Sequence, residues 1–301
     1  MKNIAPVLVL ALCLASPAFA QNTTAPAPEN QEQLAATLRD TRAAAERGDA
    51  AAQNNLGEAY LNGRGVPQDD AQAVAWFRKA AEQGNASGQN NLGLMYDTGR
   101  SVEQNDAQAV TWYRKAAEQG HAVAQNRLGW MYDTNRGVAG DEADKSWFGK
   151  ILSRMEPARN DAQAVLWFRK AAEQGDSYGQ SNLGAMYLAG RGVRRDVVQA
   201  LYWFRNAAEQ GNALGQYDLG MMYAEGRGVA QDDAQAVAWY RKAADQGFPF
   251  AQYELGMMCA EGRGVARDDA QAIAWYRKAA EQGYAEAQEA LRKMEASGRG
   301  K

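Results

Sequence analysis

A 36-residue period runs through most of this 301-residue chain. The dipeptide Leu-Gly recurs at that spacing, with one longer interval of 55 residues between its third and fourth copies. The copies begin at Leu56, Leu92, Leu128, Leu183, Leu219 and Leu255. A fixed period of about 20–50 residues is the signature of a solenoid, in which each unit buries its apolar face only against its neighbours. The period therefore predicts a repeat protein, an architecture that usually binds other molecules rather than transforming them.

Each repeat carries the signals of two helices joined by a glycine turn. In the first repeat, Ala50 to Leu61 has helical periodicity, and Gly63 follows where a left-handed helix cap is expected. The position seven residues before each repeated tryptophan is always Asp or Asn, which are favoured N-cap residues of a second helix. The predicted N-caps are Asp69, Asn105, Asn160, Asp196, Asp232 and Asp268.

Gly57 and its five counterparts lie inside the first predicted helix, where glycine costs about 1 kcal/mol relative to alanine. Six recurrences at that cost indicate a close approach between helices. We expect the glycine to make room for the tryptophan of the second helix, which is Trp76 in the first repeat.

These patterns predict an all-α fold, a right-handed α/α superhelix of six helix-pair repeats with a half-repeat cap at each end. The solenoid is expected over residues 31–297, with caps at 31–47 and 283–297. The repeats are expected at about residues 48–83, 84–119, 120–174, 175–210, 211–246 and 247–282.

The N-terminal residues predict export. Residues 1–20 have a lysine, an apolar run and an Ala18-Phe19-Ala20 cleavage site, which together indicate a signal peptide. Residues 21–30 resemble a flexible Pro/Thr tether. No second apolar run is long enough to span a bilayer. We therefore expect a bacterial protein located in the periplasm or outside the cell, without a transmembrane anchor.

The charge balance argues against nucleic acid as a partner. The formal net charge is −3, and it becomes one unit more negative if Lys2 is removed with the signal peptide. Cys259 would be the only cysteine left, so no disulfide framework is expected within one chain. The expected partners are protein or peptide segments, bound by a monomer.

The longer interval contains a 19-residue insertion, placed near residues 139–158. Trp147, Phe148 and Ile151 fall on one helical stripe in a segment that resembles a degenerate second helix, and Pro157 would end that helix. Two interpretations remain open. The stripe packs onto the solenoid, or it is a hinge or docking element.

The repeated motifs resemble the Sel-1-like repeat family, relatives of the tetratricopeptide repeats. The resemblance rests on A-Q-x-x-L-G-x-x-Y, then G-R-G-V, then D-x-x-x-A-x-x-W-[FY]-R-K-A-A-E-Q-G, and it covers about residues 48–283. Departures are Cys259 for tyrosine, Ser101 and Asn135 for loop glycines, and the insertion. The resemblance implies a superhelix whose concave face is lined by the first helix of each repeat.

The six copies of the first helix also suggest where a partner binds. Positions equivalent to 51, 54, 55, 58 and 62 vary between copies and share one side of the helix, whereas the recurrent positions lie on the other. Asparagine can pair with an extended peptide backbone, and aromatic or Met side chains serve as apolar anchors. The predicted groove residues are Asn54, Asn55, Asn90, Asn91, Asn126, Arg127, Trp130, Tyr178, Asn182, Tyr217, Met221, Tyr253 and Met257. The alternative is that these positions vary merely because solvent covers them.

No catalytic, cofactor-binding or metal-binding residues are predicted. His121 is the only histidine and lies in a turn between repeats, and Cys259 occupies a tyrosine packing position. The alternative function is an exported enzyme of the weak β-lactamase or penicillin-binding type. The resemblance implies it, because some exported proteins with this repeat are described as such enzymes. Those members are cysteine-rich, and this chain has neither their cysteines nor a Ser-x-x-Lys motif. We also expect that replacing Tyr217 and Tyr253 by alanine weakens partner binding but leaves the helicity and the melting temperature nearly unchanged.

Overall fold

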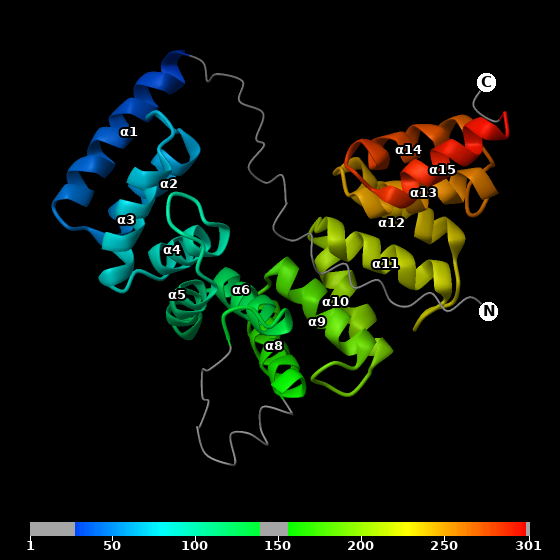
Figure 1. Cartoon of the computed structure of the whole chain (residues 1–301), viewed down its shortest axis with the longest axis horizontal. Coiled ribbons are helices and arrows are strands. Elements are labelled where there is room, and N and C mark those ends of the chain that lie inside the picture. The colour runs from blue at the N-terminus through cyan, green and yellow to red at the C-terminus, as the bar shows by residue number, and fades with distance from the viewer. Residues whose placement is uncertain (1–27, 139–155, 299–301) are drawn as a thin grey trace. The chain divides into compact units, whose positions relative to one another are not determined.

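The computed structural model describes residues 28–138 and 156–298. This part of the chain contains fourteen α-helices and no β-strand (Figure 1). None of these helices is long and apolar enough to cross a membrane.

The helices alternate as the sequence predicts. The first helices of the repeats are α2 (Ala50–Asn62), α4 (Ala86–Thr98), α6 (Ala122–Asp133), α9 (Ser177–Ala189), α11 (Ala213–Glu225) and α13 (Pro249–Glu261). The second helices are α3 (Asp70–Glu82), α5 (Asp106–Glu118), α8 (Glu156–Glu173), α10 (Val197–Glu209), α12 (Asp233–Asp245) and α14 (Asp269–Glu281). The flanking helices are α1 (Pro28–Glu46) and α15 (Ala285–Ala296).

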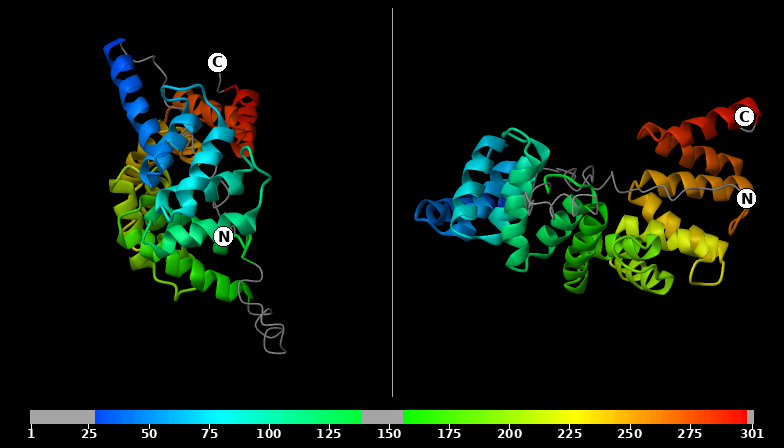
Figure 2. Two further views of the ribbon diagram at one scale, coloured as in Figure 1. Left: turned by 90° about the vertical axis from the view of Figure 1, so that its left-hand side faces the viewer. Right: turned by 60° about the horizontal axis from the view of Figure 1, so that its bottom comes forward.

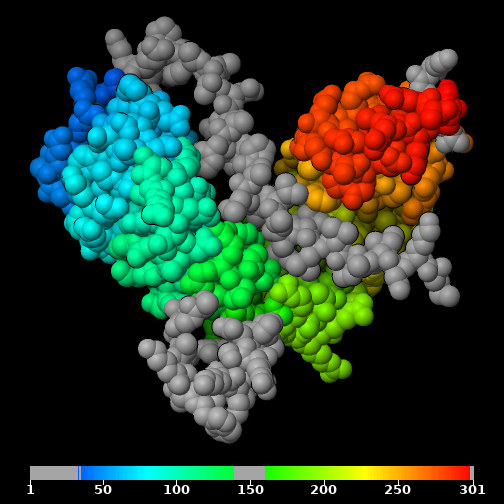
Figure 3. All heavy atoms as spheres, in the orientation of Figure 1, coloured from blue at the N-terminus to red at the C-terminus, as the bar shows by residue number. Residues whose placement is uncertain are grey.

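The chain forms two compact units, which divide between Gln104 and Asn105. In each unit, helices that follow one another in sequence pack side by side, as Figure 2 shows for α13, α14 and α15. First helices of adjacent repeats also touch, as α9 and α11 do. In the space-filling view the atoms of α13 to α15 form one continuous body (Figure 3). This nearest-neighbour packing is that of an α/α solenoid.

Five of the six predicted N-caps are confirmed. Asp69, for example, has extended backbone angles and accepts hydrogen bonds from the amides of Ala71 and Gln72. Asn160 is the exception, because α8 begins four residues earlier, at Glu156. Asn160 therefore lies inside the helix, is buried, and donates to Asn135 Oδ1 at 2.9 Å.

The residue packed against the helix glycine is not the one we expected. A Cβ atom added at Gly57 would lie 2.6 Å from the ring of Phe77, the residue after the tryptophan. The same contact recurs between Gly184 and Phe204. Phe77 is fully buried, whereas Trp76 keeps part of its surface and lies under the Lys79 ammonium, 4.0 Å from the ring centroid. The glycine is thus required by the aromatic ring after the tryptophan.

A glutamine that recurs in the first helix of each repeat connects neighbouring repeats. Gln216 is buried and donates to Ala208 O at 3.3 Å, at the end of the preceding second helix. Gln246, at the end of the next second helix, donates to Gln216 Oε1 at 2.7 Å. The same chain of bonds recurs at Gln53, Gln125, Gln180 and Gln252. Each of these backbone carbonyl oxygens also accepts a backbone amide, as Ala208 O does from Gly211 at 3.0 Å, so the glutamine fills its second acceptor position.

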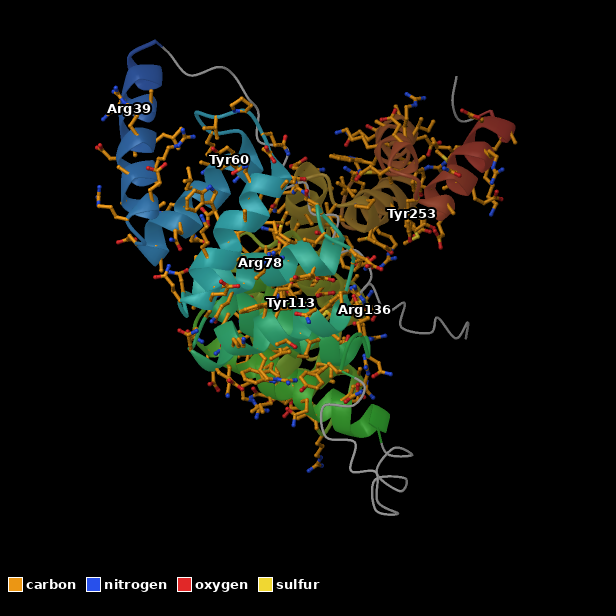
Figure 4. All side chains as sticks on the ribbon, turned by 60° about the vertical axis from the view of Figure 1, so that its left-hand side comes forward. Arg39, Tyr60, Arg78, Tyr113, Arg136 and Tyr253 are labelled. Carbon is orange, nitrogen blue, oxygen red and sulfur yellow. The ribbon has the colours of Figure 1, made fainter. Side chains whose placement is uncertain are left out.

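Arginine side chains also connect neighbouring repeats, by donating hydrogen bonds to tyrosine hydroxyl groups. Arg78 of α3 donates to the hydroxyl of Tyr96 on α4 at 3.3 Å, and Arg42 bonds Tyr60 at 2.9 Å in the same way (Figure 4 labels Arg78 and Tyr60).

Ser101 and Asn135, which replace loop glycines, have φ angles of 56° and 55°. They therefore keep the left-handed backbone that glycine adopts more easily.

Two predictions fall partly or wholly outside the described residues. The signal peptide lies there, and so does the insertion stripe of Trp147, Phe148 and Ile151. α1 begins at Pro28, so the last three residues of the range assigned to the tether are helical. Pro157 lies in the first turn of α8, where a missing backbone N–H costs little.

Candidate binding surface on the first helices

The variable positions of the first helices divide into two groups in the structure. Residues equivalent to position 54 turn inward, since Asn54 and Asn90 are each 5% exposed. Residues equivalent to positions 55, 58 and 62 keep accessible surface in most repeats. On α11 these are Asp218, Met221 and Glu225, and on α13 they are Glu254, Met257 and Glu261. We call these six residues the first-helix stripe.

Several of the asparagines predicted to line the groove bond to other residues of the chain. Asn91 Nδ2 donates to Asn54 Oδ1 at 2.9 Å and to Glu58 Oε1 at 3.2 Å. Asn182, which is 4% exposed, donates to Asn126 Oδ1 at 2.9 Å. Asn54, Asn91 and Asn182 are therefore structural links between repeats, and Asn90 donates to Asn91 within its own helix. Asn55 is the exposed asparagine of this set.

Three other predicted groove residues lie on α6 and α9. The Arg127 guanidinium lies 5.8 Å from the centroid of the Tyr113 ring. Arg136 lies 4.8 Å above the Trp130 ring, so this tryptophan packs beneath a cation. Tyr178 is 39% exposed and is the most accessible aromatic residue of the predicted groove.

Tyr217 and Tyr253 belong to an aromatic cluster in the last two repeats. The Tyr217 ring centroid lies 5.5 Å from Phe248 and 5.8 Å from Tyr240, and Tyr253 lies 5.3 Å from Tyr284. Both rings pack against the buried core, and burial raises the pKa of each phenol. The expectation that alanine at both positions leaves stability unchanged does not fit these contacts. Figure 4 marks Tyr253 on α13.

Asp218 and Glu254 are carboxylates without a hydrogen bond or ion pair among the described residues. Protein surrounds both so closely that burial raises the pKa of Asp218 to about 8 and that of Glu254 to about 7, although each keeps some accessible surface. Glu225 and Glu261 add to the rise for Glu254. Arg263 opposes this rise and lowers the pKa of Glu254, but its guanidinium is paired with Asp233.

His121 and Cys259 have structural environments. His121 caps α6, with Nδ1 accepting from the amide of Ala124 at 3.2 Å. Burial, together with Arg127, lowers the pKa of the imidazole, which suits this acceptor role because only the neutral ring can accept. Cys259 is fully buried, and burial raises the pKa of its thiol.

Sequence reasoning missed an apolar patch on α10. Val198 is 68% exposed and Tyr202 is 55% exposed, whereas the equivalent residues of α3 are both alanine. The signal was present in the sequence, because Val198 stands where the other five second helices have alanine. Sequence reasoning also missed an open hollow on the surface of unit 1. It lies between α1 and the Gly65-Val66 turn, beside Arg39 and Arg42.

Together the helix-pair fold, the recurrent glutamines and the glycine–phenylalanine contacts define a repeat solenoid, and the chain belongs to the Sel1 repeat family. The Sel1 repeat matches residues 50–85, 86–121, 122–143, 154–176, 177–212, 213–248 and 249–284. The third and fourth matches are the two parts of the repeat that the insertion interrupts.

Two solved structures are similar in sequence and fold. The protein c5321, a protective antigen of uropathogenic Escherichia coli with this repeat fold, is 41% identical with a TM-score of 0.68 over 87% of this chain. A Sel1 repeat protein from Oxalobacter formigenes is 36% identical with a TM-score of 0.67 over 84% of this chain. The match spans 52% of c5321 and 68% of the Oxalobacter protein, so this chain corresponds to about half of c5321. No curated protein matches the sequence.

Proposed function

We propose that the chain is a non-catalytic scaffold that binds a protein or peptide segment on the first-helix stripe. The observation that carries this proposal is the state of Asp218 and Glu254, which the fold holds in a closely packed setting without partners. Ionising either carboxyl group in such a setting costs free energy, as the raised pKa values reflect. A bound partner that supplies hydrogen-bond donors would offset that cost.

The surroundings of these carboxylates support the same conclusion. Met221 and Met257 lie one helical turn further along and are half-buried, so polarisable apolar surface borders both carboxylates. The Asn-rich repeats of unit 1, by contrast, use their amides to bond one repeat to the next. The last two repeats instead present carboxylates that make no hydrogen bond or ion pair with the described residues.

The proposal extends to location and assembly. The protein is exported to the bacterial periplasm or exterior, where it acts as a monomer, and the N-terminal signal-peptide pattern supports this placement. The Escherichia coli relative is described as a protective antigen, which suits a protein of the cell exterior.

Site-specific photo-crosslinking tests the binding surface. A photoreactive amino acid is placed at Met257 on the stripe and, in a control protein, at the exposed Ala238 of α12. We expect a discrete crosslinked product in the source bacterium from position 257 alone, competed away by excess unmodified protein. Equal products from both positions, or no product from position 257, contradict the proposal.

A further inference from the structure

A lysine side chain covers the tryptophan ring in five of the six second helices. The lysine follows the tryptophan by three residues, and its ammonium lies 3.7 to 4.3 Å from the ring centroid. The pairs are Trp76 with Lys79, Trp112 with Lys115, Trp167 with Lys170, Trp239 with Lys242, and Trp275 with Lys278. The negative face of an aromatic ring attracts a cation held in this way. The tryptophan of a second helix therefore binds a cation in every repeat that supplies one.

The helix α10 is the exception. Asn206 stands in the lysine position, and no cation lies over the Trp203 ring among the residues that the structure describes. Trp203 also has an indole Nε1–H that is buried and makes no hydrogen bond with the described part of the chain. Native folds leave few buried donors in this state. Trp203 thus lacks the cation that its five counterparts have, and its surroundings leave a donor unsatisfied.

Apolar side chains border the Trp203 ring. Val198 and Tyr202, one helical turn apart, are the two most exposed large apolar residues of the described chain. The Tyr202 ring packs against Trp203 in a T-shaped arrangement, with the centroids 4.9 Å apart. Leu166, which is also exposed, occupies the position equivalent to Tyr202 on α8, the second helix of the preceding repeat. Apolar residues gathered on one exposed face are typical of a protein–protein contact.

The charges of α10 favour a cationic partner. The only cation of this helix, Arg205, donates to the hydroxyl of Tyr223 on α11 at 3.5 Å. Glu209, seven residues after Tyr202 and on the same side of the helix, is exposed and makes no hydrogen bond or ion pair with the described residues. The chain as a whole carries a net charge of −3. A basic partner is therefore complementary both to the uncovered ring and to the free carboxylate.

We propose that this face of α10 docks a partner protein through a lysine or arginine of that partner, which stacks on Trp203 as lysine does in the other five repeats. Val198 and Tyr202 contact the methylene stem of the incoming side chain and the apolar residues beside it. Glu209 attracts the charged end. Because α10 is a second helix, this surface is separate from the first-helix stripe and gives the scaffold a second binding surface.

The substitution Asn206→Lys tests the inference, because it supplies within the chain the cation that the partner would bring. The probe is a random-sequence peptide library, captured on the immobilised whole protein and sequenced. The matched control is Ala274→Lys, which adds the same charge at an exposed position of α14, two repeats away. A second variant, Tyr202→Ala, removes an exposed ring without adding a charge. Thermal melting establishes that all four proteins are folded.

We expect the wild type and the Ala274→Lys control to enrich peptides with Lys or Arg beside apolar residues. The best of these peptides should bind Asn206→Lys about tenfold more weakly, as expected for a lost cation–π contact, and should also bind Tyr202→Ala more weakly.

Three results overturn the inference. The first is a wild type that captures no peptides, or peptides without Lys or Arg enrichment. The second is enrichment that persists unchanged in Asn206→Lys. The third is a wild-type dimer, measured by light scattering, that Tyr202→Ala dissociates, because this result assigns the face of α10 to a second copy of the chain.

Discussion

Arg263 forms a two-pronged ion pair with Asp233, the residue thirty positions earlier. Its Nε and Nη2 atoms lie 3.3 and 2.7 Å from the two carboxylate oxygens. The same pair recurs as Arg100 with Asp70, Arg136 with Asp106, and Arg191 with Asp161. In these four repeats it ties the loop after the first helix to the start of the preceding second helix. The recurrent Gly-Arg-Gly-Val turn is thus an architectural element.

The pair is missing where α10 begins with Val197, and Arg227 bonds Glu225 on its own repeat instead. We expect Val197→Asp to recover the inter-repeat pair and raise the unfolding free energy by about 0.5–1 kcal/mol, because the new carboxylate also lies at a helix N-terminus. Urea unfolding measures the change. Asp233→Val, the reverse substitution, should lower stability by a similar amount. Unchanged stability in both variants would show that the pair contributes nothing.

Gly184→Ala should destabilise the protein by about 1–3 kcal/mol, because the added methyl group would lie 2.7 Å from the Phe204 ring. Thermal or urea unfolding reports the loss. A smaller side chain at Phe204 tests the cause, since Phe204→Leu should make the alanine substitution less costly in a double-mutant cycle. Additive effects would mean that the glycine is needed for another reason.

Asp218→Asn should stabilise the protein in a pH-dependent way. Because the folded-state pKa of about 8 lies above the ordinary value near 4, the folded protein holds a proton between these values that the unfolded chain has released. The unfolding free energy of the wild type therefore falls as the pH rises through this window. Asparagine cannot ionise, so we expect a gain of about 1–3 kcal/mol at pH 8 and little difference at pH 4.

Urea unfolding at the two pH values measures this gain, with the exposed Asp245→Asn as the control. An equal effect of Asp218→Asn at both pH values would show that ionisation of Asp218 is not the cause.

The Cys259 thiol should react with a disulfide reagent only when the protein opens. It is fully buried, and burial raises the pKa of the thiol, so both access and thiolate formation are suppressed. Measurement requires a chain in which Cys13 is replaced by serine. Reaction rates should rise in step with unfolding as urea is added. Rapid reaction of the native protein would contradict the buried position.

How much of the structure could be predicted from the sequence depended on how far apart the interacting residues lie along the chain. The cap residue Asp69 acts on amides two and three residues away, so the sequence pattern predicted it directly. Asn160 had the same pattern but lies inside α8, because that helix starts further upstream, after the insertion. Local signals thus predicted most boundaries and were wrong where an insertion altered the repeat.

The sequence by itself determined the repeat, its two helices and the family, because a solenoid repeats the same short-range pattern in every unit. Only the tertiary structure decided which aromatic ring faces Gly57, which asparagines are consumed by inter-repeat bonds, and which carboxylates lack donors. The physical reason is that each of these contacts joins residues about 20 to 56 positions apart. Packing between neighbouring helices fixes such contacts, and the residue type at a single position does not predict them.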